Sequence, residues 1–246
     1  MNFKDLFSKQ SGDYARFRPT YPASLFQYLA SIAEAHKLAW DVGTGNGQAA
    51  VALAGHFEHV IATDPSEKQI LSAQKHPKVE YRVGSAEKTT VADQSADLIT
   101  VAQAFHWFRQ EEFFSEARRV LKPGGVLAFW CYSLAKITPE IDAVVLDLYS
   151  EILGPFWEPE RKQVENGYKN AQMPFEEVIP PRFEMTAEWS LEHLVGYLGT
   201  WSALQTYLKM NNTNPLEAIF PKLQAAWGNV KTRPVCWELG LRVGRN

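Results

Sequence analysis

Short hydrophobic runs alternate with amphipathic stretches along the first half of the chain. Four continuous runs are typical of buried strands, and a fifth segment alternates like a short strand. The continuous runs are residues 38–42, 59–64, 96–102 and 126–131, and the alternating segment is 79–84. Stretches with apolar side chains at helical spacing separate them, as in residues 24–35 and 113–121. This order over residues 24–131 predicts a doubly wound parallel sheet with helices on both faces.

The regular order of strands and helices ends after residue 133. Residues 183–189 and 235–243 alternate polar and apolar side chains, and they predict the last two strands of a seven-stranded sheet. Helices are expected over residues 138–153, 190–210 and 216–227. Residues 154–181 are rich in Pro, Gly, Trp and charge. We expect this segment to form an insertion at the rim of the sheet and not a separate domain.

Composition and charge narrow the range of partners. A chain of 246 residues fits one large domain, and its 46% hydrophobic content is enough for a sizeable core. The formal net charge of -3 gives no electrostatic footprint for nucleic acid, and no basic run would attract an anionic membrane. We therefore expect neither nucleic acid nor a membrane as a partner, and the oligomeric state stays open.

The cysteines and the N-terminus indicate the compartment. Cys131 and Cys236 lie far apart in apolar, strand-like segments, which favours two reduced core thiols over a disulfide or a metal pair. Residues 1–5 open a polar segment without the apolar core of a signal peptide, and no apolar stretch is long enough for a membrane span. We expect a cytoplasmic protein without a bound metal.

The segment from Asp41 to Gly47 carries the first candidate chemistry. It reads Asp-Val-Gly-Thr-Gly-Asn-Gly and precedes an alanine-rich stretch of high helix propensity. A glycine loop between a strand and a helix presents backbone N–H groups where a carboxylate or phosphate is stabilised. Glycines also allow a ligand to approach the backbone closely. A small, partly anionic ligand is expected at this loop.

Two details of the loop favour a methionine-like ligand over a dinucleotide. Gln48 stands where the dinucleotide-binding pattern has its third glycine, which permits close helix–strand packing above a pyrophosphate. The carboxylate of Asp41 would repel a pyrophosphate but attract an ammonium group. A ligand with both a carboxylate and an ammonium group, such as the methionine end of S-adenosylmethionine, fits both signs.

The end of the second strand predicts contacts with an adenosine. Asp64 stands 21 residues beyond Gly43, where a carboxylate can accept hydrogen bonds from both hydroxyls of a ribose. The same geometry serves NAD, so Asp64 does not choose between the two cofactors. Pro65, Ala86 and Glu87 are placed to flank an adenine. Glu87 either accepts a hydrogen bond from the exocyclic amine of the adenine or is a solvated carboxylate in a turn.

Three motifs in this order resemble those of the class I S-adenosylmethionine-dependent methyltransferases. They are the acid-x-Gly-x-Gly-x-Gly loop, Asp64 and the Leu-Lys-Pro-Gly-Gly segment at 121–125. Residues 14–22, 102–108, 200–202 and 241–245 resemble the trans-aconitate methyltransferase-like, type 11 branch of that family. The resemblance implies a Rossmann-like fold with an antiparallel last strand, S-adenosylmethionine as the cofactor, and methyl transfer as the reaction.

The resemblance also implies one methyltransferase domain over residues 1–246. Residues 1–22 are then a lid with Tyr14, Arg16 and Arg18 facing the pocket, whereas the residues alone favour an arm that packs on the core. The other parts are a cofactor-binding core, a helical or irregular insertion over the pocket, and the C-terminal part of the core, at 23–132, 133–182 and 183–246.

The reaction that the resemblance implies is an in-line displacement, in which a nucleophile attacks the methyl carbon of a sulfonium. Each loop at the end of a strand is assigned a role in this reaction. The expected cofactor-binding residues are Asp41, Gly43, Thr44, Gly45, Gly47, Asp64, Pro65, Ala86, Glu87, Gln103, Tyr14 and Arg18. Gln103 follows the fourth strand near the transferring methyl, and we group it with His106 and Trp107 as catalytic. His106 is either a general base with a pKa near neutrality or a structural histidine. Trp107 is either a wall of the pocket or part of the core.

The methyl acceptor stays open between a carboxylate, a hydroxyl and an amine. A carboxylate is ionised at neutral pH and needs no base, but it calls for a cation such as Arg16 or Arg18. A small molecule is favoured over a macromolecule because no basic surface is evident. The alternatives are an NAD(P)-dependent oxidoreductase on the same fold and a protein that binds S-adenosylmethionine without catalysis.

Overall fold

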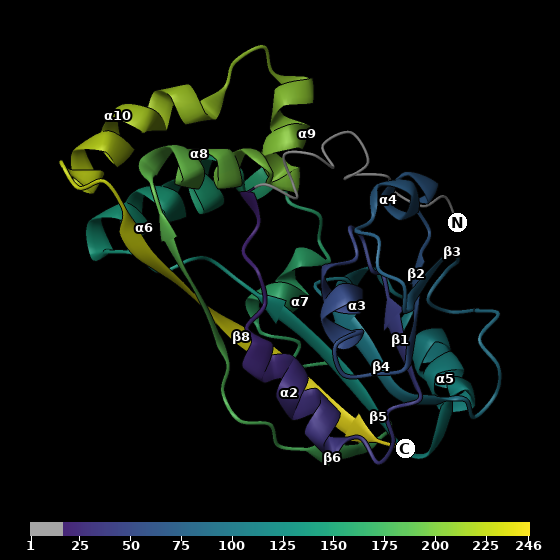
Figure 1. The fold of residues 1–246 in the computed structure, drawn as a ribbon. Coiled ribbons are helices and arrows are strands. Elements are labelled where there is room, and N and C mark those ends of the chain that lie inside the picture. Colours follow the sequence, from purple (N-terminus) through teal and green to yellow (C-terminus); the bar gives the residue numbers. More distant parts are fainter. Residues whose placement is uncertain (1–16) are drawn as a thin grey trace.

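The computed structural model describes residues 17–246, and a sheet of eight strands lies at the centre of this part. Five parallel strands follow one another in the order β3, β2, β1, β4, β5 (Figure 1). Their bounds are β1 (Leu38–Val42), β2 (His59–Asp64), β3 (Val79–Val83), β4 (Ala96–Ala102) and β5 (Leu121–Tyr132). β8 (Arg233–Arg245) pairs with β5 and is antiparallel to it. The predicted mostly parallel, Rossmann-like sheet with an antiparallel last strand is confirmed.

The edge beyond β8 differs in detail from the seven strands expected. β6 (Glu176–Val178) and β7 (Glu184–Trp189) both pair antiparallel with β8. The register of β7 on β8 continues that of β6 with an offset of one residue, so the two strands follow one another along β8. Pro180-Pro181 separates them, because proline has no N–H to donate to the ladder. β6, inside the expected insertion, is the additional strand.

The side chains of β5 alternate between the two faces of the sheet and so divide the core into two clusters. Trp130 belongs to one cluster and Phe129 to the other, and both side chains are fully buried. The first cluster lies against α2 (Ala23–Ile32) and α3 (Gln48–Leu53), and the second against α5 (Gln110–Val120) and α7 (Arg161–Glu165). α4 (Glu67–Ser72) packs on β2 and β3. Burial on both faces explains the continuous apolar runs of the strands.

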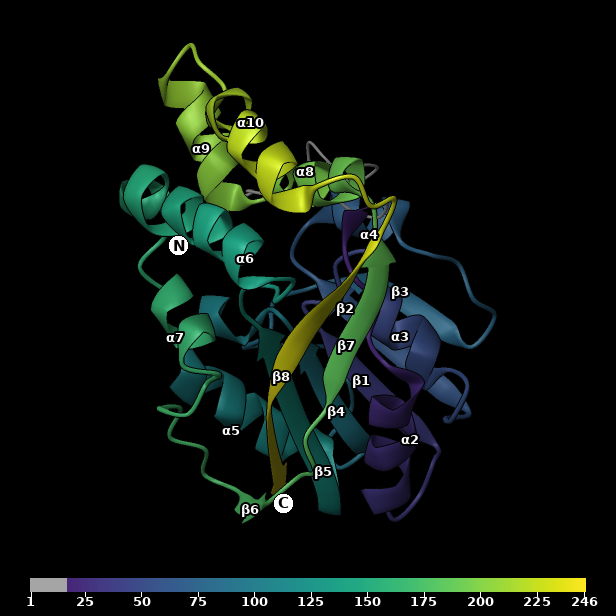
Figure 2. The same ribbon diagram turned by 90° about the vertical axis from the view of Figure 1, so that its left-hand side faces the viewer.

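A layer of helices stands beyond the carboxyl ends of the parallel strands (Figures 1 and 2). We call this layer the cap; it consists of α6 (Pro139–Asp147), the π-helical turn η2 (Leu148–Ile152), the 3-10 turn η3 (Gly154–Phe156), α8 (Leu191–Gly199), α9 (Ser202–Met210) and α10 (Pro215–Trp227). α10 packs against α6 and α8, and α9 packs against η3. Helices from both sides of β7 in the sequence therefore build one layer.

The single helix expected over residues 190–210 is wrong in one respect, because the structure has two helices there. α8 ends at Gly199 and α9 begins at Ser202. Trp201 between them is extended, with φ -69 and ψ 133, and is only 3% exposed. Glycine lowers helix propensity, and the burial of a large indole at the junction stabilises the break.

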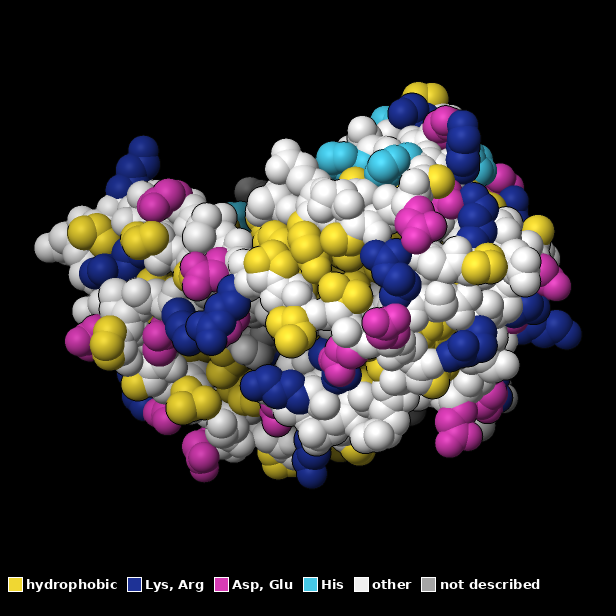
Figure 3. All heavy atoms as spheres, turned by 90° about the horizontal axis from the view of Figure 1, so that it is seen from below, with side chains coloured by type: hydrophobic (Ala, Val, Ile, Leu, Met, Phe, Trp, Pro, Cys, Tyr) yellow, Lys and Arg dark blue, Asp and Glu magenta, His cyan; other side chains and the backbone are white. Residues whose placement is uncertain are grey.

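The surface of the described residues carries mixed charge where it can be seen. Viewed from below, Lys and Arg side chains lie among Asp and Glu side chains around a patch of hydrophobic ones (Figure 3). Within residues 17–246, no helix is both long enough and apolar enough to cross a bilayer.

Candidate active site

The glycine loop between β1 and α3 uses its three glycines for different reasons. Gly43, Gly45 and Gly47 have φ angles of +66, +55 and +82, which L side chains rarely adopt. A Cβ on Gly43 would lie 2.7 Å from the Cβ of Ala104, and one on Gly47 would lie 2.1 Å from the hydroxyl of Tyr81. A Cβ on Gly45 would meet no atom within 4 Å. Gly45 is therefore the position where the backbone of the loop is open to a ligand.

Asp41 is buried and holds the glycine loop through hydrogen bonds. Its carboxylate is 0% exposed and accepts hydrogen bonds from the hydroxyls of Thr44 (2.6 Å) and Thr100 (2.7 Å). Burial raises the pKa of Asp41 to about 6 against the opposing effect of these hydroxyls. We expected this carboxylate to face a ligand ammonium group. In the structure it ties the loop to β4 instead, and Thr44 is the loop residue that it holds.

Asp64 joins the end of β2 to the open position of the loop. One carboxylate oxygen accepts a hydrogen bond from the N–H of Gly45 at 2.9 Å, and the other accepts one from the N–H of Ser66 at 2.8 Å. Asp64 is 8% exposed, and Pro65 beside it is exposed. The glycine loop and the predicted ribose-binding carboxylate, which are far apart in the sequence, therefore adjoin at one edge of the sheet.

The turn after β3 contacts the start of α5, which was not predicted from the sequence. Ala86 is buried in the cluster on the α5 face. Glu87 accepts a hydrogen bond at 3.1 Å from the N–H of Arg109, the residue that precedes α5. A carboxylate at a helix N-terminus is favourable because the helix dipole is positive there. Glu87 thus holds the start of α5, which was neither of the two roles considered for it.

Gln103 clasps the end of β5. Its side-chain amide donates to the backbone carbonyl of Tyr132 at 3.0 Å and accepts from the N–H of Tyr132 at 2.9 Å. Its backbone has a φ of +57, unusual for a residue with a side chain. Gln103 thereby fixes the carboxyl ends of β4 and β5 relative to each other. Its expected position on the wall near the transferring methyl group stays a prediction.

His106 lies in the 3-10 turn η1 (Phe105–Trp107), where it is 6% exposed. Its Nδ1 is 2.8 Å from the hydroxyl of Tyr168. Burial, with a smaller contribution from the positive charge of Arg161, lowers the pKa of His106 to about 3. The expectation of a pKa near neutrality is wrong, because the buried ring loses the hydration that stabilises its charged form. A base this weak takes a proton poorly at neutral pH.

Trp107 and Phe105 face different environments although they are close in the sequence. Phe105 is fully buried, and its ring stacks on Phe129 with centroids 4.2 Å apart. Trp107 is half-buried and has its ring centroid 4.7 Å from that of His106. A wall of the pocket stays our prediction for Trp107.

Residues 17–22, the described part of the N-terminal arm, cross the carboxyl ends of the strands. Arg18 donates to the hydroxyl of Tyr132 at 3.2 Å and to the carbonyl of Thr200 at 3.3 Å, and so links β5 to the cap. The carbonyl of Pro19 accepts a hydrogen bond at 3.2 Å from Gln48, the first residue of α3. The arm therefore passes over both the glycine loop and the cap. Tyr14 and Arg16, which we expected to face the pocket, lie outside the described residues.

Four residues of the insertion lie close to this site, and our sequence analysis missed them. They are Tyr149, Trp157, Arg161 and Tyr168. Tyr168 holds His106, and Arg161 lies over the rings of Trp157 (4.9 Å to the centroid) and Tyr149 (5.8 Å). The sequence predicted an insertion over the pocket at residues 133–182, but no spacing within it indicated which side chains turn inward.

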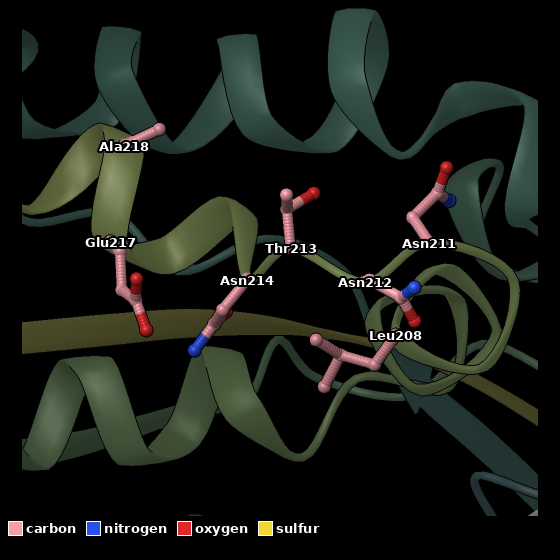
Figure 4. A pocket seen from close by; sticks show the side chains of 7 residues that line it. All are labelled: Leu208, Asn211, Asn212, Thr213, Asn214, Glu217 and Ala218. Carbon is pink, nitrogen blue, oxygen red and sulfur yellow. The ribbon is translucent and has the colours of Figure 1, made fainter.

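A separate depression lies between α9 and α10 (Figure 4). It is lined by Leu208, Asn211, Asn212, Thr213, Asn214, Glu217 and Ala218. These residues come from the end of α9, the following turn and the start of α10. None of them lies at the carboxyl end of a parallel strand, so this depression is not part of the site around Gly45.

Comparison with known proteins identifies the family. A family model described as a methyltransferase domain matches residues 40–129. A protein of Dictyostelium discoideum, assigned by inference as a methyltransferase, is 38% identical over 229 residues, which cover 92% of this chain and 87% of that protein. A solved structure from Anaeromyxobacter dehalogenans, likewise assigned as a type II methyltransferase, has a TM-score of 0.87 and 44% identity over 93% of this chain and 98% of that one. Methyltransferase cfoB of Aspergillus candidus is 28% identical over 96% of this chain and 79% of its own length.

The chain belongs to the class I S-adenosylmethionine-dependent methyltransferases, and S-adenosylmethionine is its cofactor. This membership removes the support for the NAD(P)-dependent alternative. The glycine loop fits the cofactor, because the backbone is open at Gly45 and a carboxylate, Asp64, lies directly beside it. Assignment to the trans-aconitate methyltransferase-like branch stays a prediction.

Proposed function

We propose that the protein transfers the methyl group of S-adenosylmethionine to a small-molecule acceptor whose nucleophilic atom is already ionised. The observation that carries the proposal is the contact between Gly45 and Asp64, and His106 in the turn after β4 stays neutral. The cofactor supplies a methyl group on a sulfonium, which is a good leaving group. The protein mainly has to align the reactants and exclude water.

We assign the cofactor-binding role to the loops after β1, β2 and β3. In this assignment the backbone at Gly43, Gly45 and Gly47 holds the methionine part, and Asp64 holds the ribose. Asp41 and Thr44 act through the loop, since the Asp41 carboxylate lies beneath it. Pro65 and Ala86 flank the adenine. The exposed position of Pro65 and the short path between the ends of β2 and β3, bridged by a hydrogen bond from Gly84 to Asp64, support this part.

We place the acceptor between the ends of β4 and β5, the N-terminal arm and the cap. Arg18 links these three parts, and Tyr21 of the arm packs edge-on against Trp130 with centroids 5.5 Å apart. Such a cover suits a small molecule, because it excludes water on closing. In this view the cap, together with the rest of the insertion at 133–182, is the substrate-binding part of the chain.

The protonation state of His106 helps to identify the chemical class of the methyl acceptor. A hydroxyl or amine acceptor with a high pKa needs a base, and a histidine whose pKa is about 3 serves poorly in that role. A carboxylate is ionised without help. An organic acid is therefore the acceptor that this site suits best, with His106 as a neutral hydrogen-bonding group on its wall.

Two measurements test the proposal. A thermal-shift experiment compares S-adenosylhomocysteine with NAD, and we expect stabilisation by the first alone. Incubation with labelled S-adenosylmethionine and a panel of small acids, amines and phenols then reports transfer. The variant Asp64→Asn should weaken S-adenosylhomocysteine binding, while Glu80→Gln, an exposed carboxylate on β3, should leave it unchanged. Binding of S-adenosylhomocysteine without transfer to any acceptor would favour a non-catalytic role.

A further inference from the structure

Arg161, the first residue of α7, places a positive charge beside the aromatic side chains of the cap. Its guanidinium lies 4.9 Å from the ring centroid of Trp157 and 5.8 Å from that of Tyr149. Its Nε donates to the hydroxyl of Tyr149 at 3.4 Å. Within residues 17–246, no carboxylate lies within 4.0 Å of this guanidinium, and no acceptor binds its two terminal nitrogens. The fork of the guanidinium is thus left for a ligand.

Other arginines of the protein do have carboxylate partners. Ion pairs join Arg82 to Glu80, Arg109 to Glu112, Arg119 to Glu116, Arg242 to Glu177 and Arg245 to Glu34. Arg82, Arg119, Arg242 and Arg245 are half-buried like Arg161, and each of them is balanced by a carboxylate. Arg161 is half-buried and pays for its desolvation only through aromatic faces and one hydroxyl.

The surroundings of Arg161 place it on the acceptor side of the site. α7 packs against η1 and β5, the elements that carry His106 and Cys131. The Sγ of Cys131 lies 3.6 Å from the carbonyl of Val164, and the positive charge of Arg161 contributes to the low pKa of His106. On the other side, the ring of Trp157 contacts that of Trp201, with centroids 5.6 Å apart. Arg161 therefore lies between the ends of β4 and β5 and the cap.

The side chains around Arg161 determine which kind of anion can bind there. A guanidinium presents paired N–H donors that match the two oxygens of a carboxylate. The hydroxyl of Tyr149 bonds both Arg161 and Glu165, so a carboxylate already offsets part of the positive charge from a distance. A singly charged carboxylate meets less repulsion from Glu165 than a doubly charged phosphate does. The half-buried ring of Trp157 favours a flat, apolar group next to that anion.

We propose that Arg161, with Trp157 and Tyr149, binds a carboxylate of the methyl acceptor and thereby selects organic acids with a flat, apolar body. The inference rests on the proposed function, because it places the acceptor beside the cofactor site. Arg161 is a binding residue for the acceptor and has no part in binding S-adenosylmethionine.

The test compares Arg161→Met and Arg161→Lys with the matched control Arg233→Met. Arg233 also lies over an indole, that of Trp227, but at the start of β8 and away from the site. The probes are benzoate, cinnamate and indole-3-acetate, their primary amides and phenyl phosphate, each with labelled S-adenosylmethionine. Binding of S-adenosylhomocysteine is measured in parallel for every variant.

We expect the acids to bind or be methylated and the amides and the phosphate to be poorer. Arg161→Met should raise KM or Kd for an acid about tenfold to hundredfold, the usual effect of losing a charged hydrogen bond, with little effect on the amides. Arg161→Lys should restore part of the loss, and Arg233→Met should change neither quantity. S-adenosylhomocysteine affinity should be unchanged in all three variants.

Several outcomes would overturn the inference while the proposed function stands. These are an Arg161→Met protein that binds S-adenosylhomocysteine and handles acids as the wild type does, a preference for phenyl phosphate, or a failure of every acid to bind to a protein that binds S-adenosylhomocysteine. A wild-type protein that does not bind S-adenosylhomocysteine would instead refute the proposed function. A variant that loses S-adenosylhomocysteine binding together with acid binding would show that Arg161 acts on the fold and would also overturn the inference.

Discussion

The hydroxyl of Tyr168 and the Nδ1 of His106 lie 2.8 Å apart, and both side chains are buried. Tyr168 adopts a φ of +59, so the chain accepts an unfavourable backbone conformation where it brings this hydroxyl to the ring. The pair connects the insertion to the loop after β4. Because the pKa of His106 is low, the imidazole of this pair is neutral at neutral pH.

Removing the phenol of this pair should destabilise the protein. Tyr168→Phe leaves the buried Nδ1 of His106 without a partner, which typically costs about 1–3 kcal/mol. Urea unfolding of the two proteins measures the difference. Tyr81→Phe is the control, because the hydroxyl of Tyr81 bonds a backbone carbonyl at an exposed site and should cost less. Equal stabilities of wild type and Tyr168→Phe would contradict the prediction.

The stability of the protein should depend on pH through His106. Its pKa falls from 6.5 to about 3 on folding, so between these values the unfolded chain binds the proton and the folded chain does not. His106 therefore makes the free energy of unfolding decrease as pH falls below 6.5, by up to about 1.4 kcal/mol per pH unit. Asp41 acts in the opposite sense, since its raised pKa makes stability fall as pH rises through about 6.

The difference between wild type and His106→Gln separates the two effects, because Asp41 is common to both. In urea unfolding from about pH 4 to pH 8, the difference in the free energy of unfolding between the two proteins should be constant above about pH 6.5 and should change steadily below it, because the slope due to His106 is absent from the variant. Parallel curves would show that His106 does not titrate in this way.

Substitutions of Gly47 and Gly45 should have different effects, the first mainly on stability and the second mainly on binding of the cofactor. Gly47→Ala places a Cβ against the hydroxyl of Tyr81 and adds the strain of a positive φ, so it should lower stability by about 2 kcal/mol or more. Gly45→Ala carries the strain alone, about 1 kcal/mol, yet it fills the open side of the loop. Calorimetric titration with S-adenosylhomocysteine should show at least a tenfold loss of affinity for Gly45→Ala. Unaltered affinity would exclude a close approach of the cofactor at Gly45.

The side chain of Gln103 forms two hydrogen bonds with the backbone of Tyr132, and its own backbone has a strained, positive φ. Two substitutions distinguish the effect of the hydrogen bonds from the effect of the strain. Gln103→Ala loses both hydrogen bonds to Tyr132 and keeps the positive φ, whereas Gln103→Gly loses the bonds but adopts that φ without strain. We expect the alanine variant to be less stable than the glycine variant by about 1 kcal/mol. The opposite order in thermal unfolding would show that the strain contributes little at this position.

The sequence predicted the parallel strands well because β1, β2, β4 and β5 are mostly buried on both faces and therefore continuously apolar, and β3 alternates. It also predicted the adjacency of Gly45 and Asp64, since the carboxyl ends of neighbouring parallel strands meet at one edge. These features depend on local pattern and on general rules of sheet topology. The same rules predicted the position of Gln103 and His106 after β4.

The state of individual side chains could not be predicted in this way. The pKa of His106 depends on burial by residues of the insertion, and the partner of Gln103 is the backbone of Tyr132, which no side-chain pattern marks. The break of the helix at Trp201 depends on what the indole packs against. Such properties arise from contacts between segments that are far apart in the sequence.

The interrupted edge of the sheet has a consequence for how copies of this chain meet. An outermost strand with regular, unpaired N–H and C=O groups is a template on which another chain can add a strand and start a fibre. Here the outermost position is divided into β6 and β7, and Pro180-Pro181 removes donors between them. No long straight ladder is offered to a neighbour along this stretch, which disfavours the addition of a strand from another chain there.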